Sequence, residues 1–403
     1  MEGYVHPDFD DVGSVFRHQL RRTRGGAAAA VYHRGELVVD VWGGHRSDDG
    51  DLWRQDTLAM CFSTTKGVAS TALHVLASRG EVRYDEPVAS YWPEFAQNGK
   101  DRITVRHVMS HSAGLHRLRS IIPHAERMLD WEHMVDALAA ARPAYEPGTK
   151  SGYHAITYGW LVGEIVRRVS GLPIEQFIED EISRPLGLDG LYLGCPPEER
   201  HRVAPLEPFG VAFGPPALQR CQERAVEYVS KLFSLVRSPL NPRRVLNALV
   251  PRGMEDFLYD PELLDVAVPA VNGHFSARSL ARMYAMISGR GEIDGVRLLS
   301  PEIVAEMGQV QHRGRDLVLV APMHWRLGYH RVLTTRGPVN SAFGHFGFGG
   351  SGAWADPSRD LAVAMVCNRG TGTPIGDFRL LQLGTAALQA SHERSAPELV
   401  RVA

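Results

Sequence analysis

The sequence predicts an α/β (α+β) fold, in which an antiparallel sheet is flanked by helices and accompanied by a mostly helical domain. Strand-like runs form hairpins near both ends of the chain, and helical patterns fill the middle. The 403 residues suffice for two domains or one large elaborated one. We expect a discontinuous α/β domain from residues 1–62 and 270–403, and a mostly helical domain from residues 63–269.

The first strands are two apolar runs at 27–32 and 37–42, which flank a short turn containing glycine. A matching pair near the C-terminus covers 352–355 and 361–366, on either side of a turn rich in Asp, Pro and Ser. A helical pattern over 378–388 follows. Strands at both ends of the chain predict one sheet built from both termini.

The middle of the chain predicts helices over 63–78, 104–111 and 156–169. The first ends before Gly80, and glycine is the residue that most often terminates a helix. The segment 205–251 is rich in proline and basic residues. We interpret it as a cap or lid over a substrate cleft; a helix packed on the body of the protein is the alternative.

The composition is that of an ordinary soluble globular protein, with 44% hydrophobic and 22% charged residues. The net charge of −2 gives no reason to expect nucleic acid or an anionic membrane as a partner. The chain has no run long and apolar enough to span a bilayer, and its start does not resemble a signal peptide. We therefore expect a cytoplasmic protein.

The most informative motif is Ser63-Thr64-Thr65-Lys66, at the start of a predicted helix. Positions i and i+3 share a helix face, so the lysine amine lies beside the serine hydroxyl. A lysine shielded from water can activate a serine as a nucleophile. The chain has four lysines against 40 arginines, and arginine cannot act as a base. The alternative is a helix N-terminus capped by Ser63, with Lys66 exposed.

Two further elements carry possible chemistry. Residues 147–153 form a Pro-Gly turn that presents Tyr153, whose phenol could relay a proton from Ser63 to a leaving group. A nearby lysine is expected to lower the pKa of that phenol, because a cation favours the phenolate. Residues 344–351 are rich in glycine, so a ligand could approach the backbone there. The N–H groups of Ser63 and Phe348 could form an oxyanion hole.

These elements, in this order, resemble the serine β-lactamase and penicillin-binding superfamily. The resemblance is to class C β-lactamases and, more closely, to the family VIII carboxylesterases, and it covers most of the chain. Residues 103–115, ITVRHVMSHSAGL, are similar to a family signature. The segments 84–95, 272–276 and 350–357 are also similar to family segments in the same order. The resemblance implies a β-lactamase/transpeptidase-like fold, with Ser63 as nucleophile, Lys66 as base and Tyr153 as the proton shuttle.

The resemblance also places His345-Phe346-Gly347 where the family has Lys-Thr-Gly, which implies substrate-binding positions at His345 and Gly347. A fixed cation and a hydroxyl are lost at this triplet. Tyr153-His154-Ala155 likewise lacks the asparagine of the family's Tyr-x-Asn motif. Both departures weaken recognition of a β-lactam or a D-peptide and leave the nucleophile intact. An apolar, uncharged acyl group suits such a pocket better.

We therefore predict a serine hydrolase that cleaves small carboxylic esters through an acyl-enzyme on Ser63. An acyltransferase, an amidase or a weak β-lactamase could use the same residues, and a non-catalytic binding protein is the alternative from another class. An α/β-hydrolase is disfavoured because the chain has no Gly-x-Ser-x-Gly motif. His107 and His111 have i,i+4 spacing without an acidic third ligand, so no metal is expected.

No cofactor is expected either. The expected partner is a small-molecule ester, with neither nucleic acid nor a membrane span, and a homo-oligomer is left open.

Overall fold

The computed structural model describes residues 1–22, 25–206, 242–369 and 378–395. Within these ranges the largest sheet has seven strands in the order β1-β3-β2-β12-β11-β10-β9, and every neighbouring pair is antiparallel. Its strands are β1 (Glu2–Val5), β2 (Gly26–His33), β3 (Glu36–Gly44), β9 (His330–Thr334), β10 (Gly337–Phe346), β11 (Gly352–Asp356) and β12 (Leu361–Cys367). Strands from the two ends of the chain therefore form one sheet, which confirms the predicted fold class.

The two predicted hairpins are present, and each strand is one to three residues longer than expected. The pair β2–β3 turns at Arg34 and Gly35, and the pair β11–β12 turns after Asp356. The strands join through β12, which lies beside β2 over its whole length. The N-terminal strand β1 and the irregular pair β9–β10, whose register shifts between Val339 and Phe343, were not foreseen.

Helices and two smaller sheets complete the described part. The helices are α1 (Asp10–Arg22), α2 (Thr65–Ser78), α3 (Val105–Met109), α4 (Trp131–Ala140), α5 (Thr157–Ser170), α6 (Ile174–Ile178), α7 (Arg184–Leu186), α9 (Pro242–Leu249), α10 (Met254–Leu258), α11 (Ala277–Ser288), α12 (Pro301–Met307) and α13 (Phe378–Ser395). The smaller sheets comprise β4 (Ala59–Met60), β5 (Leu191–Leu193) and β6 (Gly273–Phe275), and β7 (Glu292–Ile293) with β8 (Val296–Arg297).

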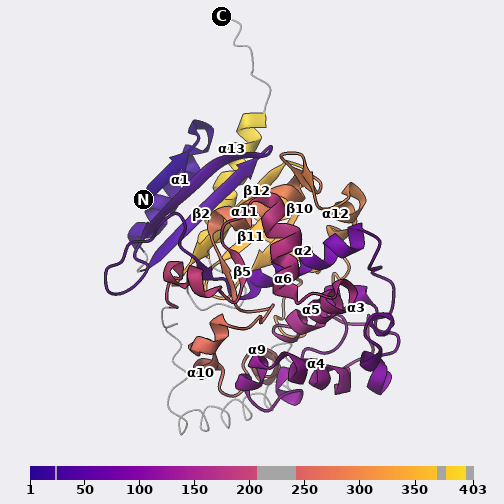
Figure 1. Cartoon of the computed structure of the whole chain (residues 1–403). Helices are drawn as coiled ribbons and strands as arrows, with labels where there is room; N and C mark the ends of the chain where they lie inside the picture. The colour runs from indigo at the N-terminus through magenta and orange to yellow at the C-terminus, as the bar shows by residue number, and fades with distance from the viewer. Residues whose placement is uncertain (23–24, 207–241, 370–377, 396–403) are drawn as a thin grey trace, which may run out of the picture.

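Both faces of the large sheet are covered by helices (Figure 1). Successive residues of a strand point to opposite faces, so Ala29 and Val31 of β2 pack in one apolar cluster with side chains of α1 and α13. Ala28 and Ala30 face the other way, into the larger cluster that includes α2, α5 and α11. Small alanine side chains on both faces let the helices pack close to the sheet.

Helix α2 lies at the centre of the larger cluster and is buried from Thr65 to Ala77. It packs against α5 and touches β10. Its polar residues are satisfied internally: Ser70 Oγ lies 2.7 Å from the Tyr158 hydroxyl, and Thr71 Oγ1 lies 2.9 Å from the Tyr329 hydroxyl. A helix buried all round can hold a side chain away from water over its whole length.

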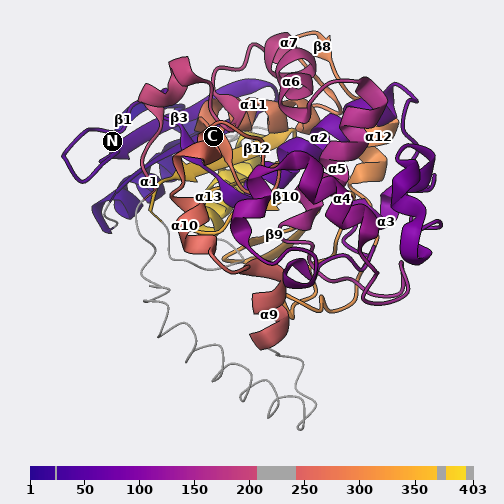
Figure 2. The same ribbon diagram turned by 60° about the horizontal axis from the view of Figure 1, so that its bottom comes forward.

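Helices α3, α4 and α5 gather on one side of the molecule, away from α1 and the N-terminus (Figures 1 and 2). The helix expected over 156–169 is α5, which ends at Gly171 with a φ of 76°. The helix expected over 104–111 is the shorter α3, capped by the Thr104 side chain. The proposed lid at 205–251 lies mostly outside the described residues, which resume at α9.

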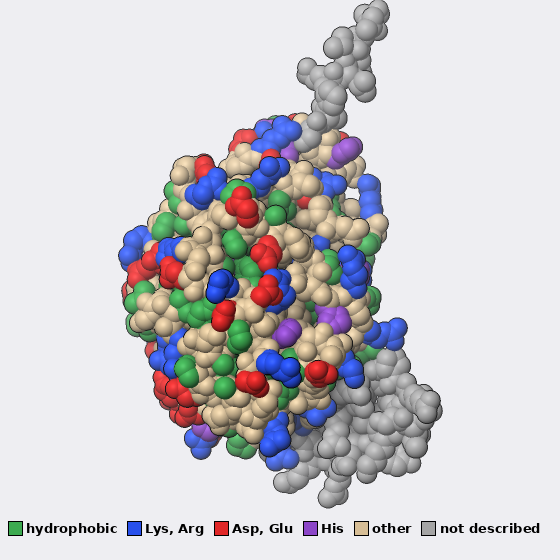
Figure 3. Space-filling model, turned by 90° about the vertical axis from the view of Figure 1, so that its right-hand side faces the viewer, with side chains coloured by type: hydrophobic (Ala, Val, Ile, Leu, Met, Phe, Trp, Pro, Cys, Tyr) green, Lys and Arg blue, Asp and Glu red, His purple; other side chains and the backbone are tan. Residues whose placement is uncertain are grey.

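Acidic and basic side chains are interspersed on the face shown in Figure 3. In the ranges described, no helix combines the length and the apolarity needed to cross a bilayer.

Several buried histidines are held in the neutral form, because burial lowers their pKa values. The pKa is lowered to about 4 for His33, His74, His274 and His330, and well below 6.5 for His111, His154 and His345. The unfolded chain therefore binds more protons than the folded chain between about pH 4 and pH 6.5.

Since stability falls wherever the unfolded state binds more protons, the free energy of unfolding should fall as pH drops through this window. We expect a loss of at least about 2 kcal/mol between pH 7 and pH 4.5, measured by urea unfolding. The variant His33→Phe should lose less stability at acid pH, because phenylalanine has no nitrogen to protonate. Its ring can keep the contact with Phe9 that the His33 ring makes. The exposed His18→Gln serves as control. A flat profile in the wild type would contradict the prediction.

Candidate active site

Ser63 lies in a short 3-10 turn, Phe62–Thr64, that connects β4 to α2. The expected helix therefore begins two residues later, at Thr65. The residue before the serine, Phe62, has a φ of +46°, in the left-handed region that a non-glycine residue seldom adopts. Backbone strain of this kind persists only where the surrounding structure enforces it. Here the Cys61 N–H donates to the Gly273 carbonyl at 2.8 Å, which fixes the segment against β6.

The Lys66 amine reaches the Ser63 hydroxyl, as the spacing predicts. Its Nζ lies 2.8 Å from Ser63 Oγ and 3.1 Å from the carbonyl oxygen of Ala270. The lysine is fully buried, and burial lowers its pKa well below the ordinary value. No carboxylate pairs with it among the described residues. A neutral amine at this distance can accept the serine proton.

Tyr153, 90 residues further along the chain, contacts the same Ser63 oxygen. Its hydroxyl donates to Ser63 Oγ at 2.7 Å, and the side chain is 3% exposed. The residue lies in an irregular segment before α5 rather than in the helix. The structure thus brings Ser63, Lys66 and Tyr153 together at one oxygen atom.

The expected direction of the Tyr153 pKa shift was wrong. Burial raises the pKa of the phenol well above its ordinary value, and the hydrogen bond to Ser63 opposes this only in part. The expectation assumed a charged lysine beside the phenol. Lys66 itself is stripped of water, so its charged form is disfavoured and offers no stabilisation to a phenolate. Tyr153 is therefore a neutral phenol that holds its proton.

His345 is buried at the end of β10, near the same group. Its Nδ1 lies 3.1 Å from the Phe346 carbonyl oxygen, so this nitrogen carries the proton and donates. Its pKa is depressed well below 6.5 by burial, and the ring is neutral. Its Nε2 has no hydrogen-bond partner in the described part of the chain. The ring centroid lies 6.2 Å from that of Tyr153, so an uncharged hydrogen-bond acceptor lies close to the phenol.

The family model described as Beta-lactamase matches residues 12–386. The chain belongs to the β-lactamase family.

Individual members of the β-lactamase family are similar over most of the chain. "Esterase/beta-lactamase LipL" of Mycobacterium tuberculosis is 40% identical over 91% of this chain and 82% of that protein. A solved family VIII carboxylesterase has a TM-score of 0.84 at 31% identity and covers 96% of this chain and 99% of its own. A penicillin-binding protein homologue from Caulobacter crescentus has a TM-score of 0.82 at 35% identity, with 96% and 99% covered. The resemblance read from the sequence is confirmed.

Gly347 directly follows β10 and lies against the Ser63 segment. Its N–H donates to the Ser351 carbonyl at 2.7 Å, so it is already occupied in this structure. A Cβ atom at this position would lie 2.3 Å from the Cys61 carbonyl oxygen. Gly347 therefore allows the end of β10 to approach the Ser63 segment closely, which a larger residue would prevent.

Phe348 is partly buried, and its ring meets Phe62 edge-on with 5.7 Å between centroids. Phe62 directly precedes Ser63 in the sequence, so this contact brings Phe348 to the segment that carries the serine. The role of the Ser63 and Phe348 N–H groups as an oxyanion hole remains a prediction.

Two residues near Tyr153 were not recognised as partners of the site. The Trp325 ring stacks on the Tyr153 ring, with centroids 5.4 Å apart and planes at 12°. The His111 ring contacts Tyr153 at 5.1 Å, and its Nδ1 accepts the His154 N–H at 3.2 Å. His107 instead caps α3, so the i,i+4 pair of histidines has separate structural roles. The signature containing His111 was visible in the sequence; its contact with Tyr153 was not.

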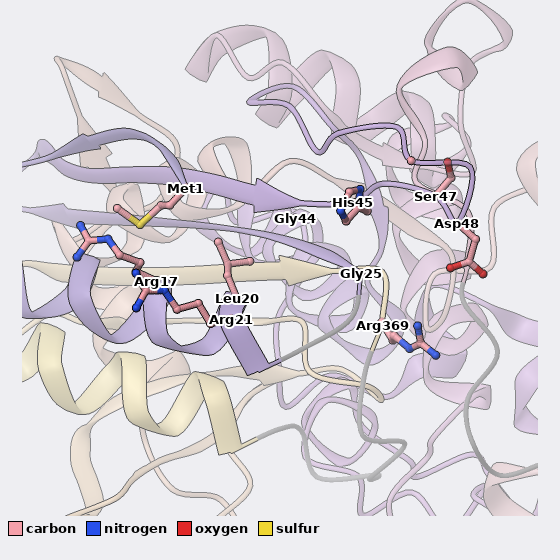
Figure 4. A pocket seen from close by; sticks show the side chains of 11 residues that line it. Met1, Arg17, Leu20, Arg21, Gly25, Gly44, His45, Ser47, Asp48 and Arg369 are labelled. Atoms are coloured by element: carbon pink, nitrogen blue, oxygen red, sulfur yellow. The ribbon is translucent and has the colours of Figure 1, made fainter.

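A cavity of about 860 Å³ opens elsewhere on the molecule, at the end of β3 (Figure 4). Met1, Arg17 and Arg21 line it together with His45 and Arg369. None of the predicted catalytic residues lines this cavity. We assign it no part in the chemistry at Ser63.

The close approach at Gly347 can be tested by adding one methyl group. Gly347→Ala should lower the free energy of unfolding by about 1–3 kcal/mol, because the new Cβ meets backbone that cannot yield easily. Gly314→Ala is the matched control, since its Cβ would meet only the His312 ring, at 3.2 Å. Urea unfolding of both variants provides the measurement. Equal stability of the two would show that the approach is not constrained.

Proposed function

We propose that this protein is a serine carboxylesterase that cleaves small carboxylic esters through an acyl-enzyme on Ser63. One observation carries the proposal: Ser63 Oγ lies 2.8 Å from the buried Lys66 amine and 2.7 Å from the Tyr153 hydroxyl. A hydroxyl held between a potential base and a proton donor is the arrangement that nucleophilic catalysis requires. Its β-lactamase-family relatives include proteins named as esterases, which supports the same reaction here.

In the acylation step, neutral Lys66 accepts the Ser63 proton while Oγ attacks the ester carbonyl carbon. Collapse of the tetrahedral intermediate breaks the bond to the alkoxy oxygen, and the acyl group remains on Ser63. Tyr153 donates its proton to the departing oxygen and is reprotonated from Lys66. A high phenol pKa suits this role, because the tyrosine then acts as a relay and does not persist as a phenolate.

In the deacylation step, water attacks the acyl carbon and gives up a proton to the same groups. The bond to Ser63 Oγ breaks, the serine regains its proton and a carboxylic acid leaves. The developing negative charge on the carbonyl oxygen requires hydrogen-bond donors. We assign this role to the backbone N–H groups of Ser63 and Phe348, as the resemblance to the family implies.

The substrate class follows from what surrounds the nucleophile. Neutral His345 replaces a lysine, and Ala155 replaces an asparagine, so two groups that bind charged or amide substrates are missing. Phe62 and Phe348 supply an apolar surface beside Ser63. An uncharged, apolar acyl group of modest size fits this chemistry best.

Acyl transfer, amide hydrolysis and weak β-lactam cleavage remain second candidates, because all three pass through the same acyl-enzyme. β-Lactam cleavage has specific support, since the relative LipL is named as both esterase and β-lactamase. A non-catalytic binding protein would have no need to keep a buried lysine against a serine hydroxyl. The contact between these two groups therefore favours an enzyme.

A paired assay separates these readings. Wild type and Ser63→Ala are compared on short and medium p-nitrophenyl esters and on a chromogenic cephalosporin. We expect ester turnover in the wild type, at least about 1000-fold less in the variant, and little cephalosporin cleavage. Comparable cephalosporin turnover would identify a β-lactamase. Absence of both activities, with Ser63 still labelled by a fluorophosphonate, would indicate an acyltransferase or an amidase.

The base can be tested separately from the nucleophile. Lys66→Arg should abolish ester turnover, because arginine retains the charge but does not accept a proton. In the wild type, kcat/KM should rise with pH as Lys66 loses its proton and reach a plateau well below pH 10.5, the ordinary lysine value. Exposed Lys150→Arg is the matched control and should leave the profile unchanged. Full activity in Lys66→Arg would exclude Lys66 as the base.

A further inference from the structure

A buried carboxylate, Asp316, lies behind the Tyr153 residue in a segment that the mechanism above does not use. The side chain is 1% exposed. Its Oδ1 accepts the backbone N–H of Tyr153 at 3.2 Å. The same oxygen accepts the N–H groups of Val318 at 2.8 Å and Leu319 at 3.0 Å. Three backbone N–H groups thus converge on one oxygen, and a carboxylate oxygen, which is an acceptor, can bind them.

The second carboxylate oxygen of Asp316 binds a different partner. Oδ2 accepts the indole N–H of Trp325 at 2.9 Å. That indole is the ring that stacks on Tyr153, and it is 1% exposed. One carboxylate thus holds both the main chain of Tyr153 and the ring that covers its face.

Backbone hydrogen bonds connect the loop around Asp316 to the Tyr153 segment. The Leu317 N–H donates to the Ser151 carbonyl at 2.9 Å, two residues before the tyrosine. The Asp316 N–H donates to the Ala321 carbonyl at 3.0 Å, and the Val320 N–H donates to the Asp316 carbonyl at 3.0 Å. The segment 316–321 is therefore held by its own backbone hydrogen bonds, and Leu317 joins it to the irregular segment 151–153.

These contacts add to those of His111 and Ser63 in fixing the direction of Tyr153. It lies outside any helix or strand, and its hydroxyl must stay 2.7 Å from Ser63 Oγ. An error of about 1 Å in the position of a reacting group can cost about 100-fold in rate. We propose that Asp316, acting through the Tyr153 main chain and the Trp325 ring, is the positioning residue that aligns the Tyr153 phenol with Ser63. This inference rests on the proposed function.

The test is a double-mutant cycle in ester hydrolysis. Asp316→Asn keeps one oxygen acceptor for the backbone donors and leaves the Trp325 indole N–H unpaired. We expect kcat to fall by about 10- to 100-fold with KM changed by less than about threefold, because the phenol acts in the transition state. In a Tyr153→Phe background the same substitution should change kcat by less than about twofold, because the group that it positions is gone.

A purely structural role would slow both backgrounds by the same factor, and this result would overturn the proposal. A wild-type kcat in Asp316→Asn would also overturn it. If Asp316→Asn does not fold, Trp325→Phe takes its place: it retains an aromatic ring, removes the indole N–H, and should show the same dependence on Tyr153. Circular dichroism and Tm establish folding in each case.

Asp356→Asn is the matched control. Its carboxylate is also buried and accepts hydrogen bonds from Ser341 and Ser358, but it lies at the β11–β12 turn. It should leave kcat unchanged. Ser63→Ala, assayed in parallel, reports on the proposed function itself. Retained ester turnover in Ser63→Ala would overturn both proposals, whereas an inactive Ser63→Ala with a fully active Asp316→Asn overturns only the positioning role.

Discussion

The exclusion of water from the Lys66 amine is the constraint on which the rest of the site depends. An amine in water keeps its proton at neutral pH and cannot serve as a base. Lys66 is fully buried and faces a serine hydroxyl and a carbonyl oxygen, without a carboxylate that would restore its charge. This environment requires a helix that is buried on every side, which α2 is. The same exclusion of water raises the pKa of Tyr153 and lowers the pKa of His345, so both side chains are neutral.

The site is assembled from segments that are far apart in the chain, and each is fixed by a different physical means. The Ser63 turn is joined to β6 through backbone hydrogen bonds and tolerates a left-handed residue before the serine. Gly347 brings the end of β10 against that turn because it has no Cβ. Tyr153 comes from irregular chain and relies on neighbouring side chains for its position. The large sheet contains strands from both ends of the chain, and one of them, β10, leads directly to Gly347.

Membership of the β-lactamase family fixes the fold and leaves the substrate open, since one fold can serve many reactions. The relatives illustrate this, because they are named as an esterase/β-lactamase, a carboxylesterase and a penicillin-binding protein homologue. What distinguishes this chain is local. Burial lowers the pKa of His345 so that its imidazole is neutral, and residue 155 is an alanine. These two positions, rather than the fold, direct the proposal toward uncharged esters.

The sequence by itself determined the local features. The i,i+3 spacing of Ser63 and Lys66 predicted that their side chains meet across one helical turn. Apolar runs on either side of turn residues predicted the two hairpins. The pairing of β12 with β2, and the contacts of Tyr153 with Trp325 and Asp316, were decided only by tertiary structure, because they join residues over a hundred positions apart. The pKa of Tyr153 was misjudged for the same reason. The expectation treated the lysine beside the phenol as charged, whereas the burial of Lys66 and of the phenol itself is a property of the folded chain.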